Sequence, residues 1–579
     1  MIKRLAKCVR QYKKDTILSP VYVTMEVIME VAIPLLMAVL IDNGIEVGNM
    51  KVIYKIGAIL IVSTLLSLLF GALAGNYAAK ASAGFASNLR IDMYDAVQDF
   101  SFSNIDKFST ASIVTRLTTD VTNVQNSFQM IIRIAVRCPI MLIFSLIMAF
   151  GVNPKLSLIF LAIIPLLSVG LFYVFQGAHP IFERVFRTYD KLNNVVQENL
   201  RGIRVVKSFV REDYENEKFD NVSNTIYKDF VKAEKMVALN SPLMQFAIYV
   251  SMLLISWFGA KMIVSDTMTT GQLVSLIAYA MQILMSLMML SMVFVMLTIS
   301  RTSAERIVEL LKEKSDLLNC INPVYEVKNG DISFENVSFS YAKDKKKYCL
   351  SNVDINIKSG ETVGIIGSTG SSKTSLVQLI PRLYDVTEGC VTVGGIDVRE
   401  YDIKTLRDQV AMVLQKNVLF SGTIKENLRW GCEEASDEEL IHVCRLAQAD
   451  SFINEFRNGY DTYIEQGGTN VSGGQKQRIC IARALLKKPK ILILDDSTSA
   501  VDTKTDAQIR KALREEIPNT TKFIIAQRIS SIEDADIIIV MEGGSINAIG
   551  THQELLAGNP IYQEVYASQV KGGKTDDAE

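Results

Sequence analysis

Six long apolar stretches constrain this chain of 579 residues more than any other feature of its sequence. Each reaches the roughly 20 residues that a helix needs to cross the hydrocarbon core of a bilayer. All six begin and end before residue 301, and no stretch of that length follows. A helix in a soluble core is seldom this long and this apolar, so the pattern predicts six membrane spans. The stretches are Leu18–Ile41, Ile56–Ala79, Met130–Phe150, Leu156–Phe175, Met236–Ala260 and Thr267–Leu297.

The positions of the basic residues predict how these spans are oriented. Three connections between spans are short, whereas segments 80–137 and 183–235 are long and hold most of the Lys and Arg of this region. Because basic loops stay on the cytoplasmic side, we expect both segments there. Helices two to five then extend well beyond the bilayer and turn near Ser101–Ser109 and Val205–Glu212. The sequence therefore predicts a multi-pass protein of the cell inner (plasma) membrane.

The N-terminal sequence MIKRLAKCVRQYKKD is basic, but it differs from a signal peptide. It lacks the short apolar region and the small-residue cleavage site that such a peptide carries. We expect it to form a helix on the cytoplasmic surface of the membrane.

Composition excludes several classes of function. The chain has 61 Lys and Arg against 62 Asp and Glu, which does not suit a generally basic nucleic-acid binder, so no nucleic-acid partner is expected. Only three His are present, too few for a zinc site built from His or for a Ser-His-Asp hydrolase. The eight Cys form no CxxC pair and are interpreted as buried or idle thiols in a reducing compartment.

From Gly330 the sequence changes to short β-rich runs that alternate with helical stretches, which is typical of an α/β domain. One run, ETVGIIGSTGSSKTSLVQLI, has the order of a phosphate loop: an apolar strand, a Gly/Ser turn and a helix. Backbone N–H groups of such a turn wrap phosphates, and a Lys reaches the β- and γ-phosphates. Here Ser372 replaces the usual last Gly, and a flexible Gly/Ser turn is the alternative. The predicted binding residues are Gly367, Ser368, Thr369, Gly370, Ser371, Ser372, Lys373, Thr374 and Ser375, with Thr374 also a ligand of Mg²⁺.

Two further motifs strengthen the prediction of a nucleotide site. The hydrophobic run KILILDD ends in Asp495, and an Asp at a strand end after a phosphate loop is placed to bind Mg²⁺. Between these two motifs lies VSGGQ, whose residues Ser472, Gly473, Gly474 and Gln475 open a helix and offer a second anion site. Each motif alone could be an ordinary turn, but all three in this order and spacing are very improbable by chance.

The combination resembles the exporters of the ATP-binding cassette family over nearly the whole chain. The resemblance implies an α-helical membrane domain with six transmembrane helices, followed by an α/β P-loop ATP-binding cassette, with ATP and Mg²⁺ as cofactors. It implies that two cassettes pair head to tail, each ATP being held by the phosphate loop of one and the signature VSGGQ of the other. It also implies that Tyr341 stacks on adenine and that Gln415 contacts Mg²⁺. The expected domains are 1–312 (transmembrane), 313–329 (linker), 330–570 (cassette) and 571–579 (disordered tail).

The departures from the family pattern fall in one site. Family members that hydrolyse ATP carry a Glu after the Mg²⁺-binding Asp, and here that catalytic position is Asp496. A base must lie within hydrogen-bond reach of the attacking water, about 2.6–3.2 Å between the two oxygens, and a misplacement near 1 Å can lower a rate on the order of 100-fold. The switch histidine of the family is replaced by Gln527, which cannot carry a positive charge. Ser372 is the third departure.

A single cause for the three departures is heterodimerisation. The chain most resembles the subunit of heterodimeric bacterial multidrug exporters whose own ATP site is degenerate. Its signature would then complete the competent site of a second half-transporter. This leads to an expected exporter of amphipathic or drug-like compounds. Two alternatives remain open: a homodimeric lipid flippase in which Asp496 still acts as base, and an ATP-binding regulatory subunit.

Four charged residues mark a candidate substrate cavity within the spans. Glu26 and Glu30 lie four residues apart on the first span, and Arg133 and Arg137 show the same spacing at the start of the third. Charges inside a span are costly and face a cavity or a partner. The functional interpretation is an acidic cavity wall that favours cationic amphipathic compounds. The alternative is a structural pairing of Glu with Arg between helices.

Overall fold

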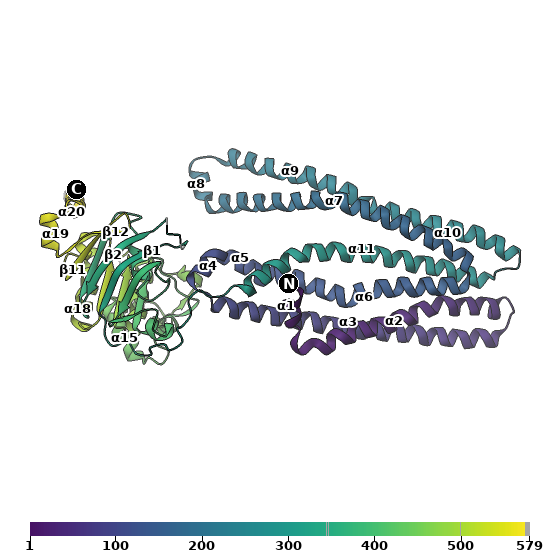
Figure 1. The fold of residues 1–579 in the computed structure, drawn as a ribbon, viewed down its shortest axis with the longest axis horizontal. Coiled ribbons are helices and arrows are strands. Elements are labelled where there is room, and N and C mark those ends of the chain that lie inside the picture. The colour runs from purple at the N-terminus through teal and green to yellow at the C-terminus, as the bar shows by residue number, and fades with distance from the viewer. Residues whose placement is uncertain (343, 346, 498, 574–579) are drawn as a thin grey trace. The chain divides into compact units, whose positions relative to one another are not determined.

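The computed structural model describes residues 1–342, 344–345, 347–497 and 499–573, and it divides into two compact units (Figure 1). The first unit comprises Met1–Gln98 and Thr110–Glu313, and the second comprises Asp99–Ser109 and the chain from Lys314 onward. The last helix extends to Gly573 and so includes the first three residues of the predicted tail. The rest of that tail, 574–579, lies outside the described residues.

The first unit is helical, as predicted. Six helical stretches in the described part of the chain are long and apolar enough to cross a membrane, which confirms the predicted fold class of this region. Its longest elements are α2 (Lys13–Leu40), α3 (Met50–Gln98), α6 (Val121–Val152), α7 (Pro154–Arg201), α9 (Glu212–Ala238), α10 (Asn240–Val264) and α11 (Thr270–Lys312). Its shorter elements are α1 (Ile2–Lys7), η1 (Arg10–Tyr12), η2 (Ile41–Ile45), α5 (Thr110–Thr115), η3 (Arg116–Asp120) and α8 (Ile203–Ser208).

Several of these helices are longer than a membrane requires. Helix α3 has 49 residues and is therefore about 74 Å long at 1.5 Å per residue, whereas the hydrocarbon core is about 30 Å thick. Helices α7 and α9 run side by side and are joined through the short helix α8, which occupies the second predicted turn (Figure 1). The sequence prediction of extended helices with a turn at this point is confirmed.

The helix starts follow from local chemistry. Asn153 accepts a hydrogen bond from the backbone N–H of Leu156, and Pro154 occupies the first helical position of α7, where its missing N–H costs nothing. Thr269 and Gln272 cap α11 reciprocally, because each side chain accepts from the backbone N–H of the other residue. Short polar residues thus set where these two spans begin.

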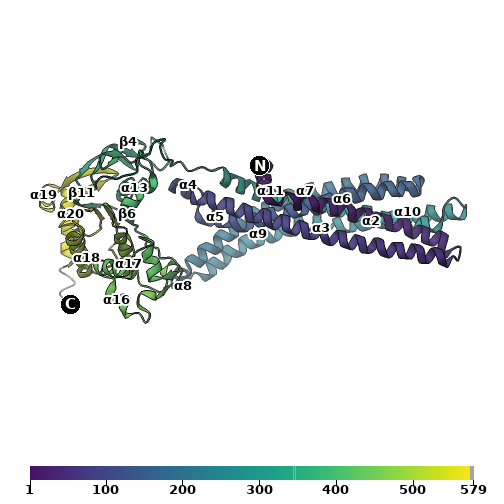
Figure 2. The same ribbon diagram turned by 90° about the horizontal axis from the view of Figure 1, so that it is seen from below.

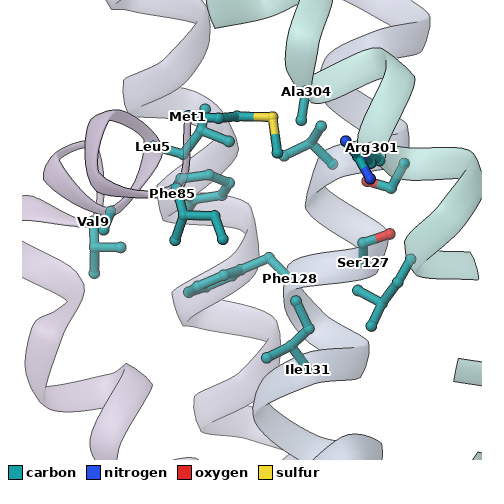
Figure 3. A pocket seen from close by; sticks show the side chains of 14 residues that line it. Met1, Leu5, Val9, Phe85, Ser127, Phe128, Ile131, Arg301 and Ala304 are labelled. Carbon is teal, nitrogen blue, oxygen red and sulfur yellow. The ribbon is translucent and has the colours of Figure 1, made fainter. Parts of the chain in front are cut away.

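Helix α1 lies beside α3, α6 and α11 and lines an apolar pocket of about 430 Å³ with them. Figure 3 shows Leu5 and Phe85 beside each other, with Phe128 and Ile131 on α6 also lining the pocket. Arg4 donates a hydrogen bond to the carbonyl oxygen of Leu311 at 3.4 Å. The N-terminal segment therefore forms a separate short helix that is tied to the first unit.

The second unit contains the α/β region. A six-stranded sheet has the order β12-β11-β3-β10-β9-β6, parallel except for β12, and a four-stranded antiparallel sheet has the order β2-β1-β4-β5. The strands are β1 (Ile332–Phe339), β2 (Leu350–Ile357), β3 (Thr362–Gly367), β4 (Glu388–Val393), β5 (Ile396–Asp397), β6 (Val410–Val413), β7 (Gly422–Thr423), β8 (Tyr463–Ile464), β9 (Ile491–Asp495), β10 (Thr521–Ile525), β11 (Ile537–Glu542) and β12 (Ser545–Gly550). The main helices are α12 (Lys373–Gln378), α13 (Ile403–Gln409), α14 (Ile424–Arg429), α15 (Asp437–Leu446), α16 (Asp450–Glu455), α17 (Gly473–Leu486), α18 (Thr503–Glu516), α19 (His552–Gly558) and α20 (Pro560–Gly573).

The strands of the six-stranded sheet are apolar on both faces because both faces are covered. Leu492 and Leu494 of β9 join one core cluster with α15, α17 and α18, whereas Ile491 and Ile493 join another with β1, β2, β4 and α12. Figure 2 shows α17 and α18 on the opposite side from β4. The near-continuous runs of Ile, Leu and Val in the sequence reflect this two-sided burial.

Helix α4 (Phe102–Phe108) belongs to the second unit although it follows α3 in sequence. Ser101 donates a hydrogen bond to Asp316 at 2.5 Å, and the hydroxyl of Tyr384 donates to Asp106 at 2.8 Å. The first predicted turn of the membrane region is therefore a helix that packs with the cassette fold.

Candidate nucleotide site and membrane cavity

The predicted phosphate loop lies between β3 and α12. Gly367 ends β3, and a side chain there would place its Cβ 2.2 Å from the carbonyl oxygen of Met541, so only glycine fits. Gly370 has φ +85°, a left-handed conformation that glycine adopts freely. Ser372 also lies in the left-handed region, at φ +67°. The family preference for Gly at this position therefore has a physical basis, and Ser372 bears a strained backbone.

Lys373 begins α12 and folds back over the loop. Its ammonium donates to the carbonyl oxygens of Gly367 at 2.8 Å and Ser368 at 2.9 Å. Burial lowers the pKa of Lys373, whereas the negative charges of Asp496 and Asp495 raise it. The lysine is thus positioned at the loop, with two carboxylates nearby.

Thr374 and Asp495 form the part of the site that suits a divalent cation. The hydroxyl of Thr374 donates to Oδ1 of Asp495 at 3.1 Å, and Oδ2 of Asp495 is buried without a hydrogen-bond partner among the described residues. Burial raises the pKa of Asp495, and the hydrogen bond from Thr374 opposes that effect. A buried carboxylate oxygen with no partner and a neighbouring hydroxyl are hard oxygen ligands, which Mg²⁺ prefers. These residues therefore fit the cation.

Asp496 and Gln527, two of the positions that depart from the family pattern, contact each other. The amide of Gln527 donates to Oδ2 of Asp496 at 2.8 Å, and the amide of Gln415 lies 3.5 Å from that oxygen. The sheet explains the meeting, because β10 lies between β3 and β9 and pairs Ile525 with Asp495. Gln527 and Asp496 are therefore neighbours at the carboxyl ends of adjacent parallel strands.

Tyr341 follows β1 and lies beside the phosphate-loop helix. Its hydroxyl lies 2.9 Å from that of Ser375, and its ring meets the ring of Tyr384 edge-on at 5.1 Å. The side chain is half exposed, so one part of the ring is available for stacking. Burial of its remaining part raises the pKa of Tyr341.

The predicted signature lies at the start of α17. Ser472 accepts from the backbone N–H of Gln475 at 3.3 Å, while the side chain of Gln475 accepts from the N–H of Ser472 at 2.9 Å. A side chain at Gly474 would place its Cβ 2.8 Å from the carbonyl oxygen of Ala500. Among the described residues, no hydrogen bond joins this segment to residues 367–375. The structure thus brings together the residues of the loop side, with the signature apart from them.

Sequence reasoning missed Tyr384, which joins Tyr341 to α4. It contacts Tyr341 on one side, and its hydroxyl donates to Asp106 on the other. Burial and the adjacent charge of Asp106 raise the pKa of Tyr384. No spacing in the sequence marks this residue, because its partners lie far away along the chain.

The four charged residues of the membrane region do come together. Arg137 forms an ion pair with Glu26 and a two-oxygen contact with Glu30, at 2.9 and 2.7 Å. Glu30, Arg133 and Arg137 line a cavity of about 750 Å³ between α2, α6 and α11, which Glu26 does not line. The sequence left two interpretations open, an acidic cavity wall and a Glu–Arg pairing, and Arg137 contacts both carboxylates. The open alternative of Glu–Arg pairing is the one that the contacts support.

The fold and this site together define a membrane protein with a nucleotide-binding cassette, and comparisons identify its family. Residues 16–287 match the family described as ABC transporter transmembrane region, and residues 350–499 match the family described as ABC transporter. The chain belongs to the ABC transporter family. It has the organisation of an exporter half-transporter, with one membrane region followed by one ATP-binding domain.

Several relatives are similar over most of their length. An uncharacterized ABC transporter ATP-binding protein of Bacillus subtilis, YfiB, is 37% identical over 544 residues, which cover 94% of each chain. Another, from Mycobacterium tuberculosis, is 34% identical over 574 residues, which cover 98% of each chain. An ATP-dependent lipid A-core flippase of Desulfotalea psychrophila is 33% identical over 83% of this chain and 84% of its own. The chain is therefore similar both to uncharacterized transporters and to a lipid flippase.

Proposed function

We propose that the chain is the degenerate-site subunit of a heterodimeric exporter that moves amphipathic or drug-like compounds out of the cytoplasm. The observation that carries this proposal is the hydrogen bond from Gln527 to Asp496. It places two of the three departures from the hydrolytic pattern in direct contact. The third, Ser372, lies in the loop that serves the same site. A group of departures in one site supports a common functional cause.

The residues of this site would bind ATP rather than hydrolyse it quickly. Lys373 would neutralise the β- and γ-phosphates, and Tyr341 would stack on adenine. Thr374, Asp495 and Gln415 would hold Mg²⁺, which, when bound, neutralises phosphate charge. Asp496 has a side chain one methylene shorter than Glu, and its Oδ2 is already a hydrogen-bond acceptor for Gln527. It would therefore orient an attacking water poorly.

The signature would act at the site of the partner subunit. Ser472 keeps its hydroxyl hydrogen available to donate, because its oxygen accepts from the N–H of Gln475. The helix N-terminus beside it favours a negative charge. We propose that this intact segment completes the competent site, that ATP binding closes the two cassettes, and that hydrolysis at the partner-based site resets the pump.

The location follows from the charges on the chain. The long basic segments would lie in the cytoplasm, together with the N-terminus and the cassette. The six spans would lie in the inner (plasma) membrane, and export would run from the cytoplasm outward.

A second candidate is a homodimeric lipid flippase. It is favoured by the similarity to the lipid A-core flippase of Desulfotalea psychrophila over most of both chains. In that case Asp496 would serve as the base in two identical sites.

ATPase assays on the purified chain separate the two candidates. The chain would be assayed alone and then co-expressed with the half-transporter encoded by an adjacent gene. The heterodimer proposal expects little activity from the chain alone and at least about tenfold more from the complex, since only the complex holds a suitably placed base. Comparable activity from the chain alone would overturn it in favour of the homodimer.

A further inference from the structure

The cavity between α2, α6 and α11 carries charge that the ion pairs do not cancel. Its apolar lining includes Ile33, Ile134, Met141, Met285 and Met289, and its volume is about 750 Å³. Three charged side chains line it: Glu30, Arg133 and Arg137. Two are cations and one is an anion, so the lining has a net charge of +1.

Glu26, which pairs with Arg137 from behind the lining, brings the sum of the four charged residues to zero, so the excess positive charge of the lining is local to Arg133. The side chain of Glu26 is only 9% exposed and is not among the lining residues. It points toward α3, where a side chain at Gly71 would place its Cβ 3.0 Å from Oε1 of Glu26. The absence of a side chain at Gly71 makes room for the carboxylate outside the cavity.

Both terminal nitrogens of Arg137 are occupied by contacts with carboxylates of the same chain. One of its terminal nitrogens pairs with Glu26, and the other contacts both oxygens of Glu30 at 2.9 and 2.7 Å. These contacts hold the carboxylate of Glu30 as well. Neither residue is therefore free to be the main charge that meets a substrate.

Arg133 is different because it forms no hydrogen bond or ion pair with any other residue that the structure describes. It lies one helical turn before Arg137 on α6, is half-buried, and lines the same cavity. Its guanidinium lies near Gly75 of α3, where an added Cβ would be 3.5 Å away. A guanidinium without a counter-ion is costly in a membrane span and normally faces a cavity or a binding partner.

We propose that Arg133 binds the anionic headgroup of an amphiphile whose apolar part lies against the Ile and Met side chains of the cavity. The inference rests on the proposed export function and names its substrate class. It differs from the cationic preference that an acidic cavity wall would give, because Arg137 contacts both carboxylates and Arg133 is the charged lining residue with no ion pair to a described residue. Flexible Met side chains accommodate tails of varied shape, while the guanidinium selects a carboxylate, sulfate or phosphate.

The test uses a matched set of fluorescent probes on the full chain, with its partner subunit where co-expression yields a complex, in phosphatidylcholine nanodiscs. The probes are a dansyl-labelled undecanoic acid, its neutral methyl ester and the corresponding cationic amine. In the wild type, the acid is expected to bind about tenfold more tightly than the ester, since only the acid forms a charge-assisted hydrogen bond with Arg133. The amine is expected to bind no better than the ester.

Three variants assign this preference to one side chain. Arg133→Gln should abolish the advantage of the acid without changing the affinity for the ester, and Arg133→Lys should keep most of it. Arg301→Gln is the matched control, because Arg301 lies on α11 outside this cavity and pairs with Glu305 at 3.0 Å. It should leave the binding of all three probes unchanged.

Four results would overturn the inference: equal wild-type binding of acid and ester, tightest binding of the amine, an equal loss of both probes in Arg133→Gln, or dissociation of the subunits in that variant. The last would mean that a carboxylate of the partner occupies Arg133. The wild-type comparison needs no variant and stands even if Arg133→Gln fails to fold.

ATPase stimulation distinguishes a failure of this inference from a failure of the proposed export function. Arg133-dependent binding of the acid without any stimulated ATPase would remove the export function but keep the site. Stimulation of the ATPase by uncharged compounds, with no preference for the acid in binding, would remove the anion site at Arg133 but keep the export function.

Discussion

The phosphate loop and the signature segment both open a helix with an anion-binding end, but their backbones suit their residues to different degrees. At the signature, Ser472 has the extended backbone of a helix cap, at φ −68° and ψ 161°, and exchanges hydrogen bonds with Gln475. At the loop, Ser372 precedes α12 in a left-handed conformation at φ +67° and makes no side-chain cap. The start of α17 therefore has a cap residue in its favoured conformation, whereas Ser372 before α12 has a strained backbone.

The difference extends to the strand end beside the loop. Asp496 also has a left-handed backbone, at φ +47°. Asp adopts this region more readily than most residues, because its short side chain can bond locally. The substitution at Asp496 therefore fits its backbone, whereas the one at Ser372 does not. The comparison therefore locates backbone strain on the loop side, at Ser372, and finds a matched helix cap on the signature side, at Ser472.

The largest effect is expected from comparing these two sides directly in the complex with a partner subunit. Ser472→Arg should lower ATPase activity by roughly 100-fold, since it removes a donor aimed at phosphate and the cap of α17. Asp496→Ala should lower it by less than about threefold, because a residue that does not act on water stabilises no transition state. Ser472→Thr, which keeps a hydroxyl cap, should retain most activity. If a steady-state assay showed a larger loss in Asp496→Ala than in Ser472→Arg, the loop side and not the signature side would serve rapid hydrolysis.

The second effect concerns nucleotide binding at the loop itself. Lys373→Ala should weaken binding of a fluorescent ATP analogue to the chain by about tenfold to 100-fold, since a charge-assisted contact is lost. Lys404→Ala on α13 removes an exposed lysine and serves as the control. Unchanged affinity in Lys373→Ala would mean that the loop holds no phosphate.

A smaller effect is expected from pH. Burial raises the pKa of Asp495, so protons compete with Mg²⁺ for this carboxylate at a higher pH than for an ordinary Asp. Lowering the pH from about 7.5 to about 5.5 should therefore weaken the Mg²⁺-dependent part of ATP binding by about twofold to fivefold. Isothermal titration with and without Mg²⁺ measures that part. Asp495→Asn should lack this pH dependence, and its persistence there would assign the effect to the nucleotide.

The smallest effect tests the strain at Ser372. Ser372→Gly should stabilise the second unit by about 0.5–1 kcal/mol, because glycine avoids the left-handed penalty but loses more chain entropy on folding. Thermal unfolding followed by Trp430 fluorescence, with Trp257 replaced by Phe, measures the change. Ser371→Gly is the neighbouring control and should destabilise, because Ser371 is buried and its hydroxyl accepts from Lys373 at 3.3 Å. A loss of stability in Ser372→Gly would remove the strain argument.

Much of the fold could be predicted because its signals are local. Apolar length identifies the spans, and an apolar strand followed by a Gly/Ser turn and a Lys identifies the loop without any knowledge of tertiary contacts. The family resemblance implied that Asp495, Asp496 and Gln527 share one site, and the sheet gives the physical reason, since the carboxyl ends of adjacent parallel strands share one edge.

The remaining features depend on contacts between distant segments. The spacing of Glu26 and Glu30, and of Arg133 and Arg137, shows which residues share a face of one helix. It does not show how α2 and α6 are rotated toward each other, so it could not reveal that Arg137 takes both carboxylates or that Arg133 pairs with no residue in the described part of the chain. The aromatic link through Tyr384 was hidden for the same reason.

Helix α4 has a consequence for how the protein is made. It is synthesised directly after α3, but Asp106 and its partner Tyr384 are separated by 278 residues. At about 5–20 residues per second, α4 waits on the order of 14–56 s for the surface on which it packs. During that interval Phe102 and the polar residues around it have no docking site on the ribosome-bound chain. A cassette expressed without residues 99–109 has the opposite defect, because Tyr384 and Asp316 then lose the helix that satisfies them.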